Sequence, residues 1–333
     1  MKNFQMYYPC NVTFGKGAEE GVGKAAAKYG KKVLLHYDSG DFLEKSGLLG
    51  RVRKSLTDQG LEVVELGGVV PNPRLSLMRK GIAICKEQGI DCIVAVGGGS
   101  TMDSAKVIGL GAVYDGDVLD FKGWGVAQKK LPVLVVPTMS GTGSEISICA
   151  MLVNDEVVPN EKFGIIADCV IPEATFLNPE LQYTLPRRQA AAGMMDIISQ
   201  VMTTWFTETK DVYLTDKIGE ATMHTVIKYG PRALENPTDY AAREQICLAA
   251  SLGAYLMIGY DRNGREVGHG LENPLTTMHM LAHGQGLALV TPSLMKYTYK
   301  RDPQRFAEWA HAVMGVEIDT FDLEGTALEG ITR

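Results

Sequence analysis

The chain has 333 residues, of which 45% are hydrophobic and 22% charged, so it can bury a sizeable core and its length suggests about two domains. Its formal net charge is -6 with no block of lysines and arginines, which argues against nucleic acid or an anionic membrane as the main partner. No stretch approaches the roughly 18 consecutive apolar residues of a membrane span, and residues 1–10 lack a signal-peptide run. We therefore expect a globular, cytoplasmic protein that binds a small molecule.

The first half of the chain alternates apolar, β-rich runs with amphipathic helical stretches, which is the pattern of parallel βαβ units. The expected strands lie at 32–37, 61–65, 92–96, 131–136, 146–153 and 163–176, and the expected helices at 42–59, 75–88 and 100–110. The six cysteines lie far apart without CxxC pairs, so we expect reduced thiols that mostly pack as small hydrophobes.

The hydrophobic pattern of the sequence changes near residue 185, where strand-like runs end and long helical patterns begin. The expected helices lie at 187–206, 212–229, 240–258 and 286–299. Two dipeptides that favour turns, Asn178-Pro179 and Leu185-Pro186, mark the boundary. We therefore predict an α/β domain over residues 1–180 and an all-α domain over residues 181–333.

A glycine-rich loop follows the expected strand at 92–96 and opens the next helix: Gly97, Gly98, Gly99 and Ser100. Glycines permit a tight turn and close approach of a ligand to the backbone, and the N-terminus of a helix attracts phosphate. The loop is therefore a candidate pyrophosphate site. Ser100 and Asp103 also fit an S-x-x-D capping box, a structural alternative that is compatible with ligand binding.

Two further features favour a nucleotide site. The loop at 137–145 follows the strand at 131–136 and is dense in hydroxyls and glycine, at the kind of position where α/β folds bind nucleotides. Asp38 stands just after the first strand, where a carboxylate can bind ribose hydroxyls and repel a 2′-phosphate. This position favours NAD over NADP. The alternative is that the Asp38 side chain forms an Asx turn. The glycines near residue 17 have the wrong spacing for GxGxxG and indicate a turn.

The helical half carries a group of polar residues that suits a metal. Asp196 and Gln200 share one face of an otherwise apolar helix, where a carboxylate is costly unless it is paired or bound to a metal. Three of the six histidines fall within fifteen residues, with an asparagine between them: His269, Asn273, His279 and His283. Imidazoles and a carboxylate suit divalent zinc or iron, whereas capping or core histidines are the alternative. No HExxH motif is present, which excludes a zinc protease of that type.

Several segments together resemble one family, the iron-containing (group III) alcohol dehydrogenases, and in particular its butanol dehydrogenase branch. The segments occur in order over nearly the whole chain: FGKG, PNPR at 71–74, VGGGSTMDSAK, PTMSGTGSE, AAGMMD, and the H-x13-H pair that ends in AHG at His283. The resemblance implies a dehydroquinate synthase-like fold: an N-terminal nucleotide-binding α/β domain and an all-α C-terminal domain, with the active site between them. It also implies a homodimer.

The resemblance assigns roles to individual residues. The dinucleotide would contact Asp38, Asn72, Gly97, Gly98, Gly99, Ser100, Asp103, Thr138, Thr142 and Lys162. Iron or zinc would be held by Asp196, His269 and His283, with Gln200 at the position of the fourth ligand. Asn273 and His279 are the candidates for a catalytic role beside the substrate.

Two positions depart from the family pattern. Gln200 replaces a histidine ligand, and because its neutral amide oxygen is the poorer donor, we expect weaker metal binding. Asn273 replaces a histidine that the family commonly carries near the nicotinamide, and an amide cannot titrate near neutral pH. Family members usually continue through more helices than are present before Arg333, which suggests a shortened C-terminal part.

The expected activity is reversible hydride transfer between NAD(H) and a small aliphatic alcohol or aldehyde, and NADP is a possible cofactor. A metal ion would act as Lewis acid. The alternative is a metal-poor, catalytically impaired relative that still binds dinucleotide and dimerises. A lyase or synthase of the dehydroquinate type is disfavoured, because the site offers few basic residues for a polyanionic substrate.

Overall fold

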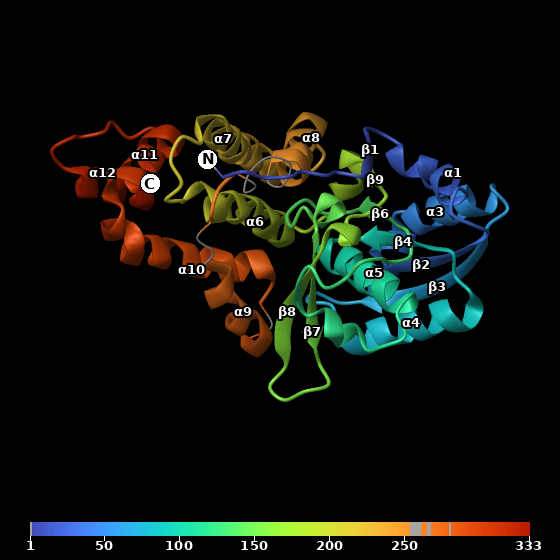
Figure 1. Cartoon of the computed structure of the whole chain (residues 1–333). Helices are drawn as coiled ribbons and strands as arrows, with labels where there is room; N and C mark the ends of the chain where they lie inside the picture. The colour runs from blue at the N-terminus through green and yellow to red at the C-terminus, as the bar shows by residue number, and fades with distance from the viewer. Residues whose placement is uncertain (1, 254–260, 265–267, 280) are drawn as a thin grey trace.

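The computed structural model describes residues 2–253, 261–264, 268–279 and 281–333. A sheet-containing half and a helical half lie next to each other, with the N-terminal segment running along the helical half before it enters the sheet (Figure 1). The backbone N–H of Lys2 donates to the carbonyl of Asp261 at 2.8 Å, and its ammonium donates to Asn263 at 2.7 Å. The first residues therefore tie the two halves together.

A six-stranded parallel sheet in the order β1-β9-β6-β4-β2-β3 forms the centre of the first half. Its strands are β1 (Asn11–Phe14), β2 (Lys32–Asp38), β3 (Glu62–Val69), β4 (Cys92–Gly97), β6 (Val133–Pro137) and β9 (Ala174–Leu177). The central strands β4 and β6 are buried along their whole length, because helices cover both faces of the sheet.

Alternate side chains of each strand enter two different cores. Val33 and Leu35 of β2 pack with α1 (Val22–Ala26) and α3 (Leu48–Thr57) on one face. Leu34 packs on the other face with α4 (Leu75–Gln88) and α5 (Gly99–Ala112). The period of two thus divides the side chains between the two faces. Because the strands are parallel, their carboxyl ends, and the loops that follow them, lie at one edge of the sheet.

A small second sheet, ordered β5-β8-β7, projects beside the helical half (Figure 1). Its strands are β5 (Gly123–Trp124), β7 (Cys149–Asn154) and β8 (Glu161–Ile166). The antiparallel pair β7 and β8 forms a hairpin, and β8 contacts helix α9. The hairpin thus carries side chains from the first half into the junction.

The second half is helical. Its helices are α6 (Arg187–Trp205), α7 (Tyr213–Glu235), α8 (Tyr240–Leu248), α9 (Gly268–His279), α10 (His283–Thr298), α11 (Pro303–Met314) and α12 (Leu323–Thr332). Aromatic side chains pack between α6 and α11, and Phe206 stacks on Phe306 at 4.4 Å between ring centroids. Asp216 of α7 accepts from Arg262 at 2.6 Å and from Arg305 at 2.7 Å, which links three segments of this half.

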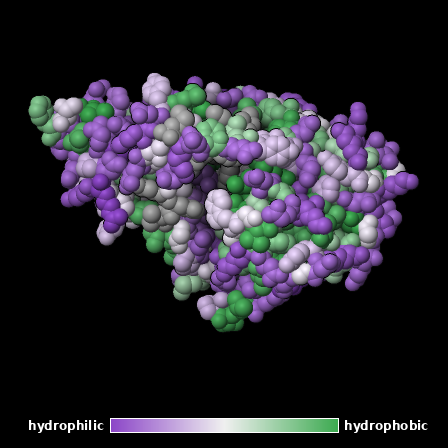
Figure 2. All heavy atoms as spheres, viewed as in Figure 1, coloured by the Kyte–Doolittle hydropathy of each residue, from purple (hydrophilic) through white to green (hydrophobic). Residues whose placement is uncertain are grey.

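Short helices complete the described chain: α2 (Phe42–Lys45) and 3-10 turns at Ala18–Gly21, Val118–Phe121, Ser144–Ile146, Asp168–Val170, Pro179–Gln182 and Tyr299–Arg301, with a π-helical turn at Ala249–Gly253. Among the described helices, none is long and apolar enough to cross a membrane. On the face shown in Figure 2, hydrophilic residues predominate and hydrophobic groups are interspersed among them.

The predicted fold class is confirmed, but several predicted elements were wrong in detail. The expected helix at 42–59 is two helices, because Gly47 adopts a left-handed φ of 71° between them. The expected strand at 163–176 is divided between β8 and β9 by a 3-10 turn, and the strand expected from residue 146 begins at Cys149. Asp38 is the last residue of β2 instead of following it. Strand β1 and helices α9, α11 and α12 were not predicted, and residues 254–258 of the helix expected at 240–258 lie outside the described residues.

His36 links β2 to its neighbours inside the sheet-containing half. Its Nδ1 lies 2.6 Å from the carbonyl of Leu66 and its Nε2 lies 2.8 Å from Ser104 Oγ. Because the carbonyl can only accept, Nδ1 carries the proton and Nε2 accepts from the hydroxyl. Burial lowers the pKa of His36 to about 4.

This burial makes stability depend on pH. Between about pH 6.5 and 4 the unfolded chain binds a proton at His36 that the folded chain excludes, so the free energy of unfolding decreases as the pH falls. We expect the wild type to lose roughly 2 to 3 kcal/mol more than His36→Gln between pH 7 and 4.5. Urea unfolding of both proteins at the two pH values measures the difference. Parallel pH dependence of the two proteins would contradict the prediction.

Candidate active site

The glycine-rich loop joins the end of β4 to the start of α5. Gly98 occupies the N-cap position of α5 and no side chain caps the helix, so the capping-box alternative was wrong. Ser100 Oγ instead accepts from the backbone N–H of Asn72 at 3.2 Å. The Asp38 carboxylate accepts from the backbone N–H of Gly98 at 3.3 Å and from the Thr101 hydroxyl, so it bonds to the glycine loop and not to its own turn.

The three glycines of this loop serve two different purposes. A Cβ at Gly97 would lie 2.5 Å from Thr101 Oγ1, and a Cβ at Gly99 would lie 2.6 Å from Thr142 Oγ1. These two positions must be glycine because neighbouring side chains fill the space. A Cβ at Gly98 would meet only an ordinary contact at 3.9 Å, and Gly98 lines the cleft. Its backbone is therefore open to a ligand.

A buried network holds the second loop against α5. Asp103 accepts from Ser144 Oγ at 2.6 Å and from the N–H of Met151 at 3.1 Å. Lys106 is completely buried, and its ammonium donates to Ser144 Oγ at 2.9 Å and to the carbonyl of Cys149 at 2.8 Å. Burial raises the pKa of Asp103 and lowers the pKa of Lys106. Sequence analysis missed Lys106, although a lysine inside an otherwise apolar helix is a signal of such a network.

Two cavities extend from these loops to the helical half. The first is lined by Asp38, Gly98, Thr138, Thr142, Asp196 and His283, among others. The second is lined by Ser100, Lys162, Gln200, His269, Asn273 and His283, among others. Asn72 borders both cavities in a left-handed conformation with a φ of 58°, which is strained for a residue with a Cβ. His283 therefore lines both cavities.

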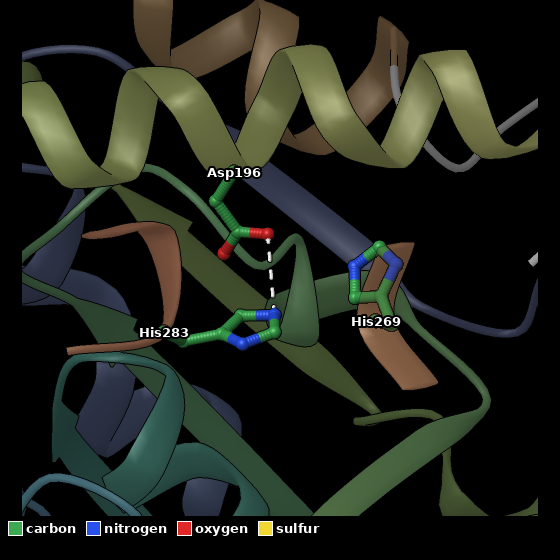
Figure 3. Close-up of side chains that lie close together, drawn as sticks. All are labelled: Asp196, His269 and His283. Atoms are coloured by element: carbon green, nitrogen blue, oxygen red, sulfur yellow. Dashed lines mark ion pairs between the residues drawn. The ribbon is translucent and has the colours of Figure 1, made fainter. Parts of the chain in front are cut away.

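Asp196, His269 and His283 come together at this junction. Asp196 lies on α6, His269 near the start of α9, and His283 is the first residue of α10. The three side chains point toward one another (Figure 3), their ligand atoms all lie within 4.8 Å of one another, and His283 Nε2 lies 3.7 Å from Asp196 Oδ1. Ligands at about 2.0–2.2 Å from a zinc ion are at most about 4.4 Å apart, so small side-chain shifts suffice for a shared ion.

The electrostatics of the three residues suit a cation. Burial raises the pKa of Asp196, although His283 and Gln200 lower it in part. Burial, followed by the charge of His283, lowers the pKa of His269 to about 4, which keeps its imidazole neutral, as metal binding requires. Gln200 Nε2 lies 3.3 Å from Asp196 Oδ1, so the amide is next to the ligand set, and rotation of the amide brings its oxygen to the same place. The donor set therefore fits a divalent metal ion.

Glu272 is a site residue that sequence analysis missed. It lies on α9 and is completely buried. It accepts from His283 Nδ1 at 2.7 Å and from the Lys162 ammonium at 3.4 Å. Burial acts to raise the pKa of Glu272, but His283 and Lys162 together outweigh it, so the pKa lies below its usual value. Its position three residues after His269, on one face of a helix, was the signal available in the sequence.

The structure does not bring His279 to the site. His279 is exposed at the C-terminal end of α9 and lines neither of the two cavities. Ten residues of helix separate it from His269, a rise of about 15 Å. Asn273, by contrast, lines the second cavity beside Gln200 and His269.

Comparison with known proteins agrees with this geometry. Residues 9–179 match the family described as iron-containing alcohol dehydrogenase, and residues 190–332 match the C-terminal part of the Fe-containing alcohol dehydrogenase family. NADH-dependent butanol dehydrogenase A of Clostridium acetobutylicum is 36% identical over 319 residues, which cover 95% of this chain and 81% of the relative. The NADPH-dependent aldehyde reductase YqhD of Escherichia coli is 32% identical and covers 92% of this chain and 78% of its own length.

Solved structures point to the same relatives. The crystal structure of NADH-dependent butanol dehydrogenase A from Thermotoga maritima has a TM-score of 0.94 at 33% identity, covering 100% of this chain and 82% of that chain. The resemblance inferred from the sequence motifs is thereby confirmed. The chain belongs to the iron-containing alcohol dehydrogenase family, in its butanol dehydrogenase branch.

Proposed function

We propose that this NAD(P)-dependent oxidoreductase interconverts a small aliphatic alcohol and its aldehyde with NAD(H), at a metal site formed by Asp196, His269 and His283. One observation carries the proposal: the open N-terminus of α5 borders the same cavity as Asp196 and His283, and the ligand atoms of these two residues and of His269 all lie within 4.8 Å of one another. When bound, iron or zinc would supply Lewis-acid polarisation of the substrate oxygen, and the nicotinamide would supply or accept the hydride. The side chains around the metal and the nicotinamide would bind and orient the cofactor and the substrate.

The glycine loop suits the pyrophosphate of the dinucleotide. The N-terminus of α5 offers backbone N–H groups and a favourable dipole for negative charge, and Gly98 leaves the approach open. Six other proposed contacts line the two cavities around this point: Asp38, Asn72, Gly99, Ser100, Thr138 and Thr142. Gly97 is buried at the end of β4 and lines neither cavity, so we assign it the role of leaving room for Asp38 and Thr101. We assign Asp103 the role of holding the second loop in place, since both its oxygens are engaged by Ser144 and Met151. The Asp38 carboxylate in the cleft supports NAD over NADP.

The second cavity suits the substrate. Lys162, Gln200 and Asn273 line it together with His269 and His283, whereas Asp38 does not. Asn273 can hold a substrate oxygen by hydrogen bonding, but it cannot supply a proton near neutral pH. We therefore propose that Asn273 orients the substrate and takes no part in proton transfer.

We further propose a cytoplasmic homodimer in which residues 1–180 and 181–333 are the two domains. All six cysteines are free thiols, which suits a reducing compartment. Among the described strands, β1 pairs with β9 alone and is exposed along its length, and Val12 and Phe14 are partly uncovered. An apolar edge strand of this kind is suited to pairing with another chain.

The direct test of the function uses purified protein loaded anaerobically with Fe²⁺ or Zn²⁺ and supplied with NADH and butanal. We expect NADH oxidation with at least one of the metals, and slower oxidation of NADPH. No oxidation with either metal would contradict the proposed activity. Metal analysis together with NADH fluorescence titration identifies the alternative, because an impaired relative binds nucleotide without stoichiometric metal.

Gln200→His should strengthen metal binding, because it replaces the amide beside Asp196 with an imidazole. We expect at least a tenfold lower dissociation constant for Zn²⁺, measured by competition with a chelator, and a higher turnover. Gln304→His, on the exposed side of α11, is the matched control and should bind as the wild type does. Equal affinity in all three proteins would place Gln200 outside the ligand sphere.

Asn273→His should change the pH profile more than the metal affinity, because it adds a titrating group beside the substrate pocket without altering a proposed ligand. Aldehyde reduction needs a proton, so kcat/KM for butanal should decrease as the pH rises through roughly 6.5. The alcohol oxidation rate should change in the opposite direction. A profile identical to that of the wild type would show that position 273 does not reach the reacting oxygen.

A further inference from the structure

We infer that Glu272 is a positioning residue of the metal site: its carboxylate sets which nitrogen of His283 faces the ion. The inference rests on the metal site proposed above. It concerns a side chain that is neither one of the proposed ligands nor a proposed cofactor contact. Three independent features of the structure support it.

The first feature is the way the buried charge of Glu272 is satisfied. A completely buried carboxylate is costly unless donors surround it. Here they come from three places: His283 Nδ1 on α10, the Lys162 ammonium on β8, and the Thr276 hydroxyl one turn further along α9. Thr276 bonds to Oε1, and His283 and Lys162 bond to Oε2, so both oxygens of the carboxylate are held by donors from three elements.

The second feature is the orientation of His283. A carboxylate can only accept, so the 2.7 Å contact requires the proton on Nδ1 of the imidazole. The lone pair of Nε2 is then directed toward Asp196, 3.7 Å away, where the ion would bind. A ligand imidazole whose second nitrogen donates to a carboxylate is held in one tautomer and becomes a more basic donor.

The third feature is the close packing of α10 on Glu272. A Cβ added at Gly286 would lie 2.6 Å from Glu272 Cγ and 2.8 Å from its Oε1. The glycine therefore lets the helix that carries His283 approach the carboxylate. Gly270, on the same helix as Glu272, has open space at its Cβ position. The two glycines form a matched pair for testing whether the carboxylate must stay in place.

The test measures the affinity and the visible spectrum of bound Co²⁺, with a competing chelator. Glu272→Gln removes the charge but keeps the size of the side chain, and we expect affinity to fall about 10- to 100-fold, with an altered spectrum. Glu220→Gln is the control, because Glu220 is also largely buried and paired with a lysine, Lys217, but lies on α7 and does not contact His283. It should leave both measurements unchanged.

Gly286→Ala provides a second variant that keeps the carboxylate but displaces it. It should lower Co²⁺ affinity in the same direction, whereas Gly270→Ala should not. If Glu272→Gln does not fold, this pair decides the question. A role limited to packing would lower the melting temperature of the metal-free protein and leave Co²⁺ affinity and spectrum unchanged, and that result would overturn the inference.

The outcome for the wild type separates the two proposals. A wild type that binds no Co²⁺ contradicts the metal site itself, and with it the proposed function. If the wild type binds Co²⁺ and the Glu272→Gln and Gly286→Ala variants bind it equally tightly, only the role of Glu272 is contradicted.

Discussion

The cost of burying charge at the junction between the two halves constrains the whole site. Asp196 and Glu272 are buried with almost no exposure, and so are Asp103 and Lys106 on the neighbouring helix. Each would destabilise the fold if it stood alone, so each needs a partner of fixed position. The partners come from distant parts of the sequence, as in the contact between Lys162 and Glu272. The two halves are thereby held in one relative arrangement, and the same arrangement creates the cleft.

The parallel sheet and the helices contribute differently to this cleft. The sheet brings the ends of β2, β4 and β6 to one edge, which places Asp38, the glycine loop and the second loop side by side. The helices bring an aspartate and two histidines from α6, α9 and α10 to a common point. A reaction that needs a dinucleotide and a polarised oxygen requires both parts within one cleft. The active site therefore depends on packing between the halves more than on either half alone.

The two departures from the family pattern act on different steps. Gln200 lies next to Asp196, so in the proposed site it would change how strongly an ion is held. Asn273 lines the neighbouring cavity, so its proposed effect is on how a substrate is oriented. In the proposed site, Glu272 would offset part of the weaker donor at Gln200, because an imidazole that donates to a carboxylate is a better ligand than one that does not.

The sequence by itself determined the fold class and the place of the glycine loop, and it indicated which residue types form the proposed ligand set. Hydrophobic periodicity and helix-start residues are local signals, so β4, α5 and the face shared by Asp196 and Gln200 were predicted from short segments. Strand β1 was missed because its four residues, NVTF, give only two polar/apolar repeats, which is too short a run to identify a strand.

Only the tertiary structure decided which polar residues meet. The contact of Glu272 with Lys162 joins residues 110 positions apart, and no local pattern contains that information. It likewise separated Asn273, which lines the pocket, from His279, which is exposed two turns further along the same helix. Local sequence fixes the period of an element, whereas the contact between two elements depends on how their apolar faces pack and on where their buried charges find partners.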